Sequence, residues 1–259
     1  MSTGASIENI AQNVQPVYRE TLYKVAQLND EGLGTTCAND SPDDDIVILV
    51  FILSVGSLVE QYARAWGFNV LRCDPPRKER EGGDFISLEE LLSAADIVTL
   101  HTPLDRTTHH LINDRTMALM HDDAVLINAS RGEVASTETL LKASQRLLID
   151  VWEHEPEIDR ELLAKAIVAT PHIAGYSSQG KANAAAMVVR AAAERFALPL
   201  TEWYPEQVRI AERQKIDWQT MCLTIQSHCD LEAESAKLKA APEGFEAMRN
   251  GYHYREEYF

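Results

Sequence analysis

Three residues of the chain have side chains suited to the oxidation of a 2-hydroxy acid, namely Arg131, Glu155 and His172. A guanidinium group offers a bidentate fork for a carboxylate and polarises an adjacent carbonyl. A histidine whose pKa lies near the working pH takes the proton of a hydroxyl as the hydride leaves. A carboxylate beside the imidazole holds its tautomer and stabilises the charged form. Each of the three residues follows a short apolar run, so they can converge on one crevice if those runs lie side by side.

The apolar runs and the segments between them predict the elements that would position these residues. Each run is nearly continuous, which is typical of parallel strands buried on both faces; the runs cover residues 46–53, 68–73, 96–101, 124–128, 146–151 and 166–170. Helix-like segments, several opened by a Ser, Asn or Asp N-cap, cover residues 57–66, 87–95, 113–120, 136–144 and 159–166. This alternation predicts an α/β fold with a doubly wound, Rossmann-like parallel sheet. Ligands of such a sheet bind outside the carboxyl ends of its strands.

The stretch IVILVFILSVGSLV, residues 46–59, allows two interpretations, a short membrane anchor or the first strand of the sheet. It contains Ser54, Gly56 and Ser57 within fourteen residues, whereas a membrane span needs about 20 apolar residues. It also follows three aspartates and has no basic flank. We therefore expect a strand, and no membrane association.

Charge and cysteine content limit the partners. The net charge of −16 argues against nucleic acid and anionic membranes, which need clustered Lys and Arg, but not against a small anionic substrate. The four cysteines show neither a C-x-x-C pair nor metal-ligand spacing, which predicts free thiols and no metal site. The opening residues MSTGASIENI lack the features of a signal peptide. The expected location is cytoplasmic.

Several sequence blocks resemble those of a known family. LINASRGEV, IDVWEHEPE and TPHIAGYSSQGKAN are similar to signature blocks of the D-isomer-specific 2-hydroxyacid dehydrogenases. DPPRKEREGGDF, the HTPL after DIVTL, and the C-terminal LKAAPEGFEAMRNGYHYREEYF resemble the branch that oxidises 4-phospho-D-erythronate. The resemblance runs from about Ile46 to the C-terminus and is loose over residues 205–230.

The resemblance implies a reaction and the residues that carry it out. The catalytic residues would be Arg131, which binds the substrate carboxylate, and Glu155 with His172, which form the acid–base pair. The substrate would be a small phosphorylated 2-hydroxy acid, oxidised at C2 to the 2-oxo acid with NAD as hydride acceptor, in pyridoxal-phosphate biosynthesis. The family is dimeric, so the implied assembly is a homodimer.

The resemblance also implies the cofactor-binding residues. Asp74 would accept hydrogen bonds from the adenosine ribose and would favour NAD over NADP by repelling a 2′-phosphate. The remaining positions would line the cofactor site or pack its first helix: Gly56, Thr102, Pro103 and Asp150.

Each of these residues also has a purely structural interpretation. Arg131 after an apolar strand could be a surface residue, and His172 could be a structural histidine. Asp74 could simply cap the turn before the two prolines that follow it. Glu153 is a rival to Glu155, which we prefer because it precedes a proline, as in the family pattern.

The implied division of the chain has three parts. Residues 1–45 are an N-terminal segment and linker, a remnant or replacement of the substrate domain, with a helix expected over residues 10–28. Residues 46–200 form the dinucleotide-binding domain, which ends in an Ala-rich helix over residues 179–197. Residues 201–259 form a small C-terminal α+β region suited to dimerisation, with a helix-like end over residues 245–259. That aromatic tail would pack on a neighbouring domain or subunit, or on its own domain.

The chain departs from the family at three places. With Gly56 aligned to the third glycine of G-x-G-x-x-G, Phe51 and Leu53 stand at the first two, where a side chain would occupy phosphate space. The N-terminal segment is much shorter than a substrate domain, and LLKASQRLLIDV is shortened, so that a helix is truncated or a strand displaced. Two functions remain open, a working NAD-dependent dehydrogenase, which we prefer, and a catalytically inactive relative that acts as a folded or dimerising module.

Overall fold

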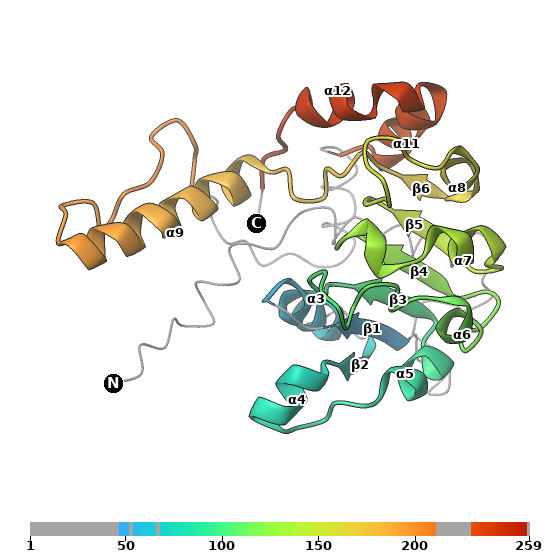
Figure 1. Ribbon diagram of the computed structural model, residues 1–259. Helices are drawn as coiled ribbons and strands as arrows, with labels where there is room; N and C mark the ends of the chain where they lie inside the picture. The colour runs from blue at the N-terminus through green and yellow to red at the C-terminus, as the bar shows by residue number, and fades with distance from the viewer. Residues whose placement is uncertain (1–46, 52–53, 66–67, 211–228, 258–259) are drawn as a thin grey trace.

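The computed structural model describes residues 47–51, 54–65, 68–210 and 229–257 and contains one six-stranded parallel sheet (Figure 1). Its strand order is β2-β1-β3-β4-β5-β6. The strands are β1 (Val47–Phe51), β2 (Asn69–Cys73), β3 (Ile97–Leu100), β4 (Val125–Asn128), β5 (Arg146–Ile149) and β6 (Val168–Ala169). Every strand lies within an apolar run, and the predicted fold class is confirmed. The predicted N-terminal segment, with its helix over residues 10–28, lies outside the described residues.

The helices between the strands follow the predicted segments closely. They are α3 (Ser54–Ala65), α4 (Pro75–Glu81), α5 (Leu88–Ala94), α6 (Asp114–Met117), α7 (Thr137–Lys142), α8 (Arg160–Lys165) and α9 (Ser178–Phe196). Ser87 and Glu90 form a capping box at α5, and Asp159 caps α8 through the N–H of Leu162. Ser136 begins α7 without a side-chain cap. The sequence analysis missed α4, whose side chains are all at least partly exposed, because a helix without a buried face has no apolar periodicity.

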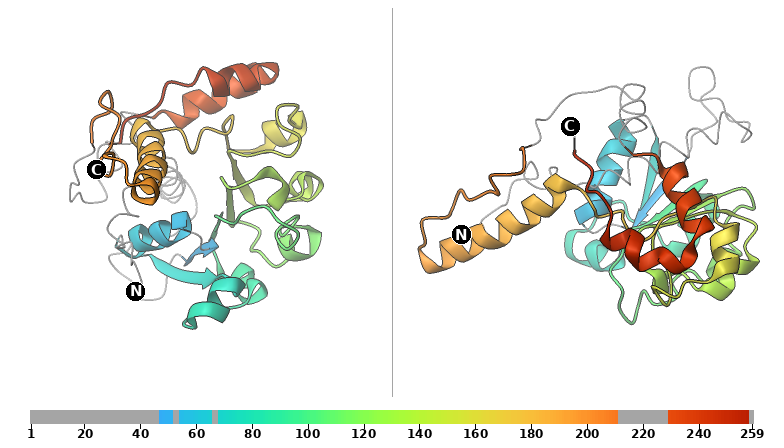
Figure 2. Two further views of the ribbon diagram at one scale, coloured as in Figure 1. Left: turned by 60° about the vertical axis from the view of Figure 1, so that its left-hand side comes forward. Right: turned by 90° about the horizontal axis from the view of Figure 1, so that it is seen from above.

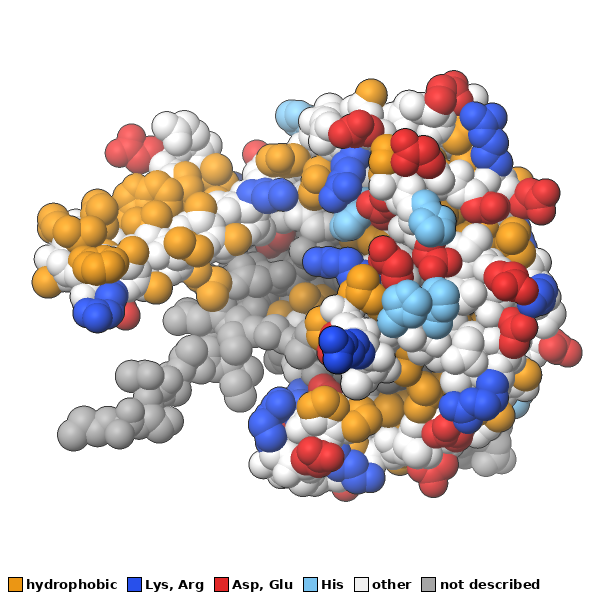
Figure 3. All heavy atoms as spheres, in the orientation of Figure 1, with side chains coloured by type: hydrophobic (Ala, Val, Ile, Leu, Met, Phe, Trp, Pro, Cys, Tyr) orange, Lys and Arg blue, Asp and Glu red, His pale blue; other side chains and the backbone are white. Residues whose placement is uncertain are grey.

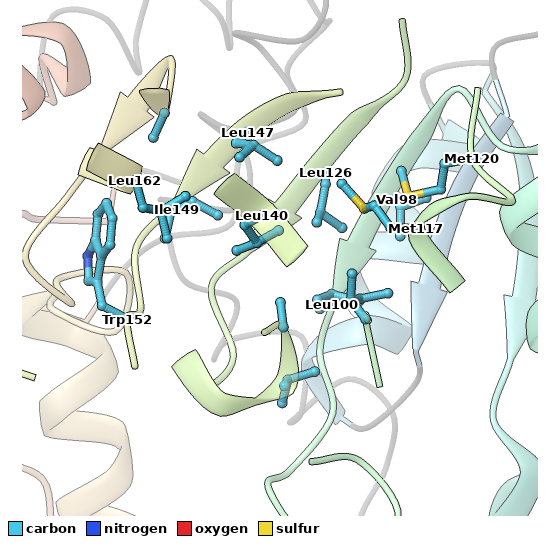
Figure 4. Close-up of a cluster of buried hydrophobic side chains, with 14 of the residues drawn as sticks. Val98, Leu100, Met117, Met120, Leu126, Leu140, Leu147, Ile149, Trp152 and Leu162 are labelled. Carbon is cyan, nitrogen blue, oxygen red and sulfur yellow. The ribbon is translucent and has the colours of Figure 1, made fainter. Parts of the chain in front are cut away.

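The core lies on both faces of the sheet, as expected of a doubly wound fold. Along β3 to β5, alternate residues point to opposite faces, so Leu126 belongs to one cluster while Val125 and Ile127 belong to the other. The first cluster includes side chains of α5 to α8 and is shown in Figure 4. The second includes Val59 and Ala63 of α3.

The segment between β4 and β5 that appears shortened in the sequence forms a short helix, followed by a strand that pairs in register with β4. Helix α7 has six residues, and β5 pairs with β4 along its whole length, from Arg146 beside Val125 to Ile149 beside Asn128. Of the two outcomes left open, the truncated helix holds, and the strand is not displaced.

The C-terminal residues pack on the sheet domain of the same chain. Helix α11 (Leu231–Ala240) lies against β6 and contributes Leu231 to one core cluster and Leu238 to the other. A 3₁₀ turn (Pro242–Gly244) leads into α12 (Phe245–Asn250). The expected helix over residues 245–259 is therefore too long. It ends at Asn250 because residues 252–257 instead run beside the start of α9, where Arg255 and Glu257 bond other segments. The predicted division at residue 201 stays a prediction.

Helix α9 extends away from the sheet (Figures 1 and 2). Its first turns pack through Gln179, Ala182 and Ala186, whereas Met187 and Val188 are exposed by 61% and 71%. Apolar side chains gather along this arm in Figure 3. Within the part of the chain that the structure describes, no helix is long and apolar enough to span a membrane.

Candidate active site

Two cavities lie at the carboxyl ends of the strands. The larger, of about 720 Å³, is lined by residues that follow β3 to β6 and by the start of α9, including Thr102, Pro103, Arg131, Asp150, His172 and Lys181. The smaller, of about 400 Å³, lies beside β2 and α4, and its lining includes Asp74. Thr102 and Pro103 line both cavities, which are therefore neighbours.

His172 lines the larger cavity and is in direct contact with Glu155, which lies seventeen residues earlier in the sequence. Nδ1 of His172 lies 2.8 Å from Oε2 of Glu155, and the other carboxylate oxygen accepts the backbone N–H of Trp152 at 2.9 Å. His172 has a left-handed backbone with φ of 55°, and its N–H donates to the carbonyl of Asp150 at 2.8 Å. With Nδ1 held by the carboxylate, Nε2 is the ring nitrogen left for a substrate.

Glu153, the alternative to Glu155, uses both of its carboxylate oxygens in other contacts. Its Oε1 lies 2.7 Å from Nε2 of His110, and its Oε2 accepts the backbone N–H of Thr137 at 2.6 Å. Burial raises the pKa of Glu153, but the hydrogen bonds from Thr137 and His110 outweigh it and lower the pKa overall. Glu153 ties α7 to the loop after β5, which supports the choice of Glu155 as the partner of His172.

Asp150 fixes the loop that carries His172. Its buried carboxylate accepts hydrogen bonds from the Thr170 hydroxyl at 2.7 Å, the Ile173 N–H at 2.8 Å and the Ala174 N–H at 3.1 Å. Burial raises the pKa of Asp150, against the opposing effect of these donors. Its backbone carbonyl also accepts from His172, so Asp150 lines the cavity and sets the direction of the neighbouring loop.

Arg131 lines the same cavity, and its guanidinium bonds neither Glu155 nor His172 among the described residues. Its Nη1 donates to the carbonyl of Ser130 at 2.6 Å, while Asn128 donates to the Arg131 carbonyl and accepts from Ser130. The next residue, Gly132, allows a close backbone approach, since a Cβ there would lie 2.0 Å from the carbonyl carbon of Trp152. This contact joins the loop after β4 to the loop that carries Glu155.

Asp74 is the N-cap of α4. Its Oδ1 accepts the backbone N–H of Arg77 at 2.9 Å, so Asp74 does have the structural capping role that was the alternative to ribose binding. A carboxylate has acceptor capacity for more than one donor, and Asp74 also lines the smaller cavity. Both roles are compatible in one side chain.

The family is settled by comparison with known proteins. Residues 44–174 match the model of the D-isomer specific 2-hydroxyacid dehydrogenase, NAD binding domain. The chain belongs to this family. The match agrees with the doubly wound sheet and confirms NAD as the predicted cofactor of this domain.

Curated relatives that match more than half of the chain share one name. An erythronate-4-phosphate dehydrogenase from Bacteroides thetaiotaomicron is 39% identical over 230 residues, which are 85% of this chain and 65% of the relative. Another from Proteus mirabilis is 45% identical over 158 residues, 57% of this chain and 42% of the relative. The chain thus spans less than two thirds of the length of these relatives.

Solved structures of the family show the same fold. The D-lactate dehydrogenase with NAD⁺ from Lactobacillus jensenii superposes with a TM-score of 0.51 at 25% identity, over 82% of this chain and 71% of that one. The D-lactate dehydrogenase from Aquifex aeolicus, complexed with NAD and lactic acid, gives a TM-score of 0.50 at 25% identity over 80% and 73%.

The described residues are placed to hold both ends of the NAD molecule that domains of this family bind. Asp74 stands at the smaller cavity, and Thr102 and Pro103 connect that cavity to the larger one, where His172 lies. The sheet reverses its winding between β1 and β3, which is where such folds bind dinucleotides. Gly56 lies in the first turn of α3, as the glycine alignment requires. Leu53 lies outside the described residues, and the structure describes only the backbone of Phe51.

Three residues of the site have no role predicted from the sequence. Tyr176 and Lys181 line the larger cavity and lie within the block TPHIAGYSSQGKAN, so the block itself was the available signal. Arg249 of α12 lies 3.4 Å from Glu155, across 94 residues of sequence, and no local pattern indicates it.

Proposed function

We propose that the chain is an NAD-dependent dehydrogenase that oxidises 4-phospho-D-erythronate at C2 to the 2-oxo acid, a step of pyridoxal-phosphate biosynthesis. The observation that carries the proposal is the contact of Glu155 with His172, which lines a cavity together with Arg131 at the ligand-binding edge of an NAD-binding sheet. The names of the relatives support the choice of substrate.

The geometry supports a division of labour among the three residues. Arg131 binds the substrate carboxylate through its guanidinium fork. Nε2 of His172 takes the proton of the C2 hydroxyl, and Glu155 stabilises the resulting imidazolium through Nδ1. NAD, when bound, accepts the hydride from C2.

The charges at the cavity match a substrate with two anionic groups. The protein carries a net charge of −16, yet the larger cavity is lined by the cations Arg131 and Lys181. Asp150 is the acidic residue among the described lining, and its oxygens are taken up by three protein donors. With Arg131 on the carboxylate, Lys181 is the cation for the phosphate.

Calorimetric titration with NAD tests the first requirement of this function. Binding with a Kd in the micromolar to low millimolar range is expected, and Arg115→Ala provides the matched control, because Arg115 lines neither cavity and is exposed in an ion pair with Glu89. Absence of heat and of thermal stabilisation at millimolar NAD would contradict the proposal and favour the inactive relative.

An assay of NADH formation with 4-phosphoerythronate tests the chemistry. His172→Ala should lower kcat by about 10²–10⁴-fold, the usual contribution of a general base. Arg131→Ala should raise KM and lower kcat together, because the carboxylate contact serves both binding and orientation. Activity that survives both substitutions would show that the assigned residues are wrong.

We also infer a homodimer with α9 in its interface. The arm exposes Met187, Val188 and, at its end, Phe196 by 69%, and the segment that returns along it exposes Ile210 by 62%. Apolar surface of this extent is usual at protein interfaces. Sedimentation should give a dimer that Met187→Glu with Val188→Glu converts to a monomer, and an unchanged mass would contradict this interface. The cytoplasmic location stays a prediction.

A further inference from the structure

We propose that Arg249, in the C-terminal helix α12, is a positioning residue that holds Glu155 and Tyr176 and offsets part of the negative charge that Glu155 presents to His172. The inference rests on the proposed function for its role in turnover, but its geometric and electrostatic content is independent of turnover.

The contacts of Arg249 place it behind the acid–base pair. Its Nη1 lies 3.4 Å from Oε2 of Glu155, the oxygen that also contacts Nδ1 of His172 at 2.8 Å. Its Nε donates to the hydroxyl of Tyr176 at 3.3 Å. One planar guanidinium therefore bonds a carboxylate and a phenol on two different loops through two separate nitrogens.

Helix α12 is anchored firmly enough to give Arg249 a defined position. Phe245, at its first turn, is 1% exposed and belongs to the main core cluster. Beyond the helix, the buried Arg255 donates to the carbonyl of Ile173, and Glu257 accepts from the hydroxyl of Ser177. The C-terminal segment thus holds the loop that carries His172 at several points.

The charge of Arg249 has a definite effect on its neighbours. The guanidinium beside Glu155 offsets part of the negative charge that this carboxylate presents to His172. Removal of the guanidinium would leave His172 facing the full charge of Glu155, which is the change that the variants below test. The other charged or titratable groups at the pair are Asp150 and Tyr176, with the cavity cations lying across the site.

The test follows the titration of His172 by NMR in the whole chain. The signal is assigned by its loss in His172→Asn. In Arg249→Gln the pKa of His172 should rise by about one unit, because an opposing charge has been removed at close range. In Arg249→Lys, which keeps the charge, most of the original pKa should return.

Ile97→Val is the control for a general loss of stability. Ile97 is buried in the core cluster that does not include α12, so the variant should lower thermal stability and leave the pKa of His172 unchanged. An unchanged pKa in Arg249→Gln, or an equal rise in Ile97→Val, would overturn the inference.

A second measurement separates this inference from the proposed function. With 4-phosphoerythronate and NAD, the acid limb of kcat/KM in Arg249→Gln should move to higher pH by the same amount as the NMR titration. A shift in the NMR titration without turnover in any variant would uphold the role of Arg249 and contradict the dehydrogenase. Turnover with no shift in either measurement would do the reverse.

Discussion

The two ends of the site are built in different ways. At the acid–base end, Glu155 and His172 are held by contacts from separate segments, including Asp150 after β5 and Arg249 in α12. At the ribose end, Asp74 bonds the N–H of Arg77, three residues along the same turn. One end is a junction of distant segments, and the other is a local cap.

This difference sets what each end tolerates. A local cap contributes about 1 kcal/mol and can be replaced by any good capping residue. A junction depends on the spacing of several backbones, so that a small change in one loop moves the others. The acid–base end should therefore be sensitive to packing changes that the ribose end would absorb.

The largest expected effect comes from Gly132→Ala. Its Cβ would lie 2.0 Å from the backbone of Trp152 and would push apart the loops after β4 and β5. We expect a loss of about 3 kcal/mol or more in the free energy of unfolding, together with loss of turnover. Urea denaturation and the NADH assay measure the two effects.

Gly82→Ala is the control for this substitution. A Cβ at Gly82 meets nothing within 4 Å, and only its backbone conformation, with φ of 66° and ψ of −160°, opposes a side chain. The expected cost is about 1–3 kcal/mol of backbone strain, without an effect on turnover, so turnover is the measurement that separates the two variants. Equal losses in the two variants would show that the close approach at Gly132 carries no special weight.

The same difference between local contacts and contacts of distant segments decides which parts of the site can be predicted from the sequence. The strands and the polar residues at their ends were readable from apolar runs, since burial on both faces removes polar side chains from the strands. Arg131, His172 and the glutamates after the fifth run were singled out as candidates in this way, and the family pattern favoured Glu155 over Glu153. Arg249 was not, because its partner lies 94 residues away and is brought to it only by the packing of α12. The end of α12 at Asn250 likewise depends on contacts that residues 252–257 make with α9.

The two glutamates after β5 offer a comparison within the junction itself. Glu155→Gln should lower kcat by about 100-fold or more, because the imidazolium loses its partner. Glu153→Gln should change kcat by less than about threefold and cost about 1–2 kcal/mol of stability, since it weakens the contact with His110. The opposite ranking in the NADH assay would make Glu153 the functional carboxylate.

Two substitutions of Asp74 test whether this residue binds the ribose of NAD, as proposed, or only caps α4. Asp74→Asn keeps a capping side chain but removes the charge, so stability should hold while the preference for NAD over NADP falls by about tenfold. Asp74→Ala should also lose about 1 kcal/mol of stability. Calorimetry with both dinucleotides and thermal unfolding separate the two roles. A preference for NAD that survives in Asp74→Asn would leave this residue as a cap alone.

The smallest expected effect concerns His101, which lines the larger cavity just after β3. Burial lowers the pKa of His101 to about 3, whereas a histidine in the unfolded chain has a pKa of about 6.5. Below pH 6.5 the unfolded chain therefore binds a proton that the folded protein does not, and stability falls as pH falls toward 3. Between pH 6.5 and 5.5 the loss from this residue should be about 1 kcal/mol. Urea denaturation of wild type and His101→Asn across this range should show the shallower pH dependence in the variant, and equal slopes would mean that His101 is protonated in the folded protein, which its burial opposes.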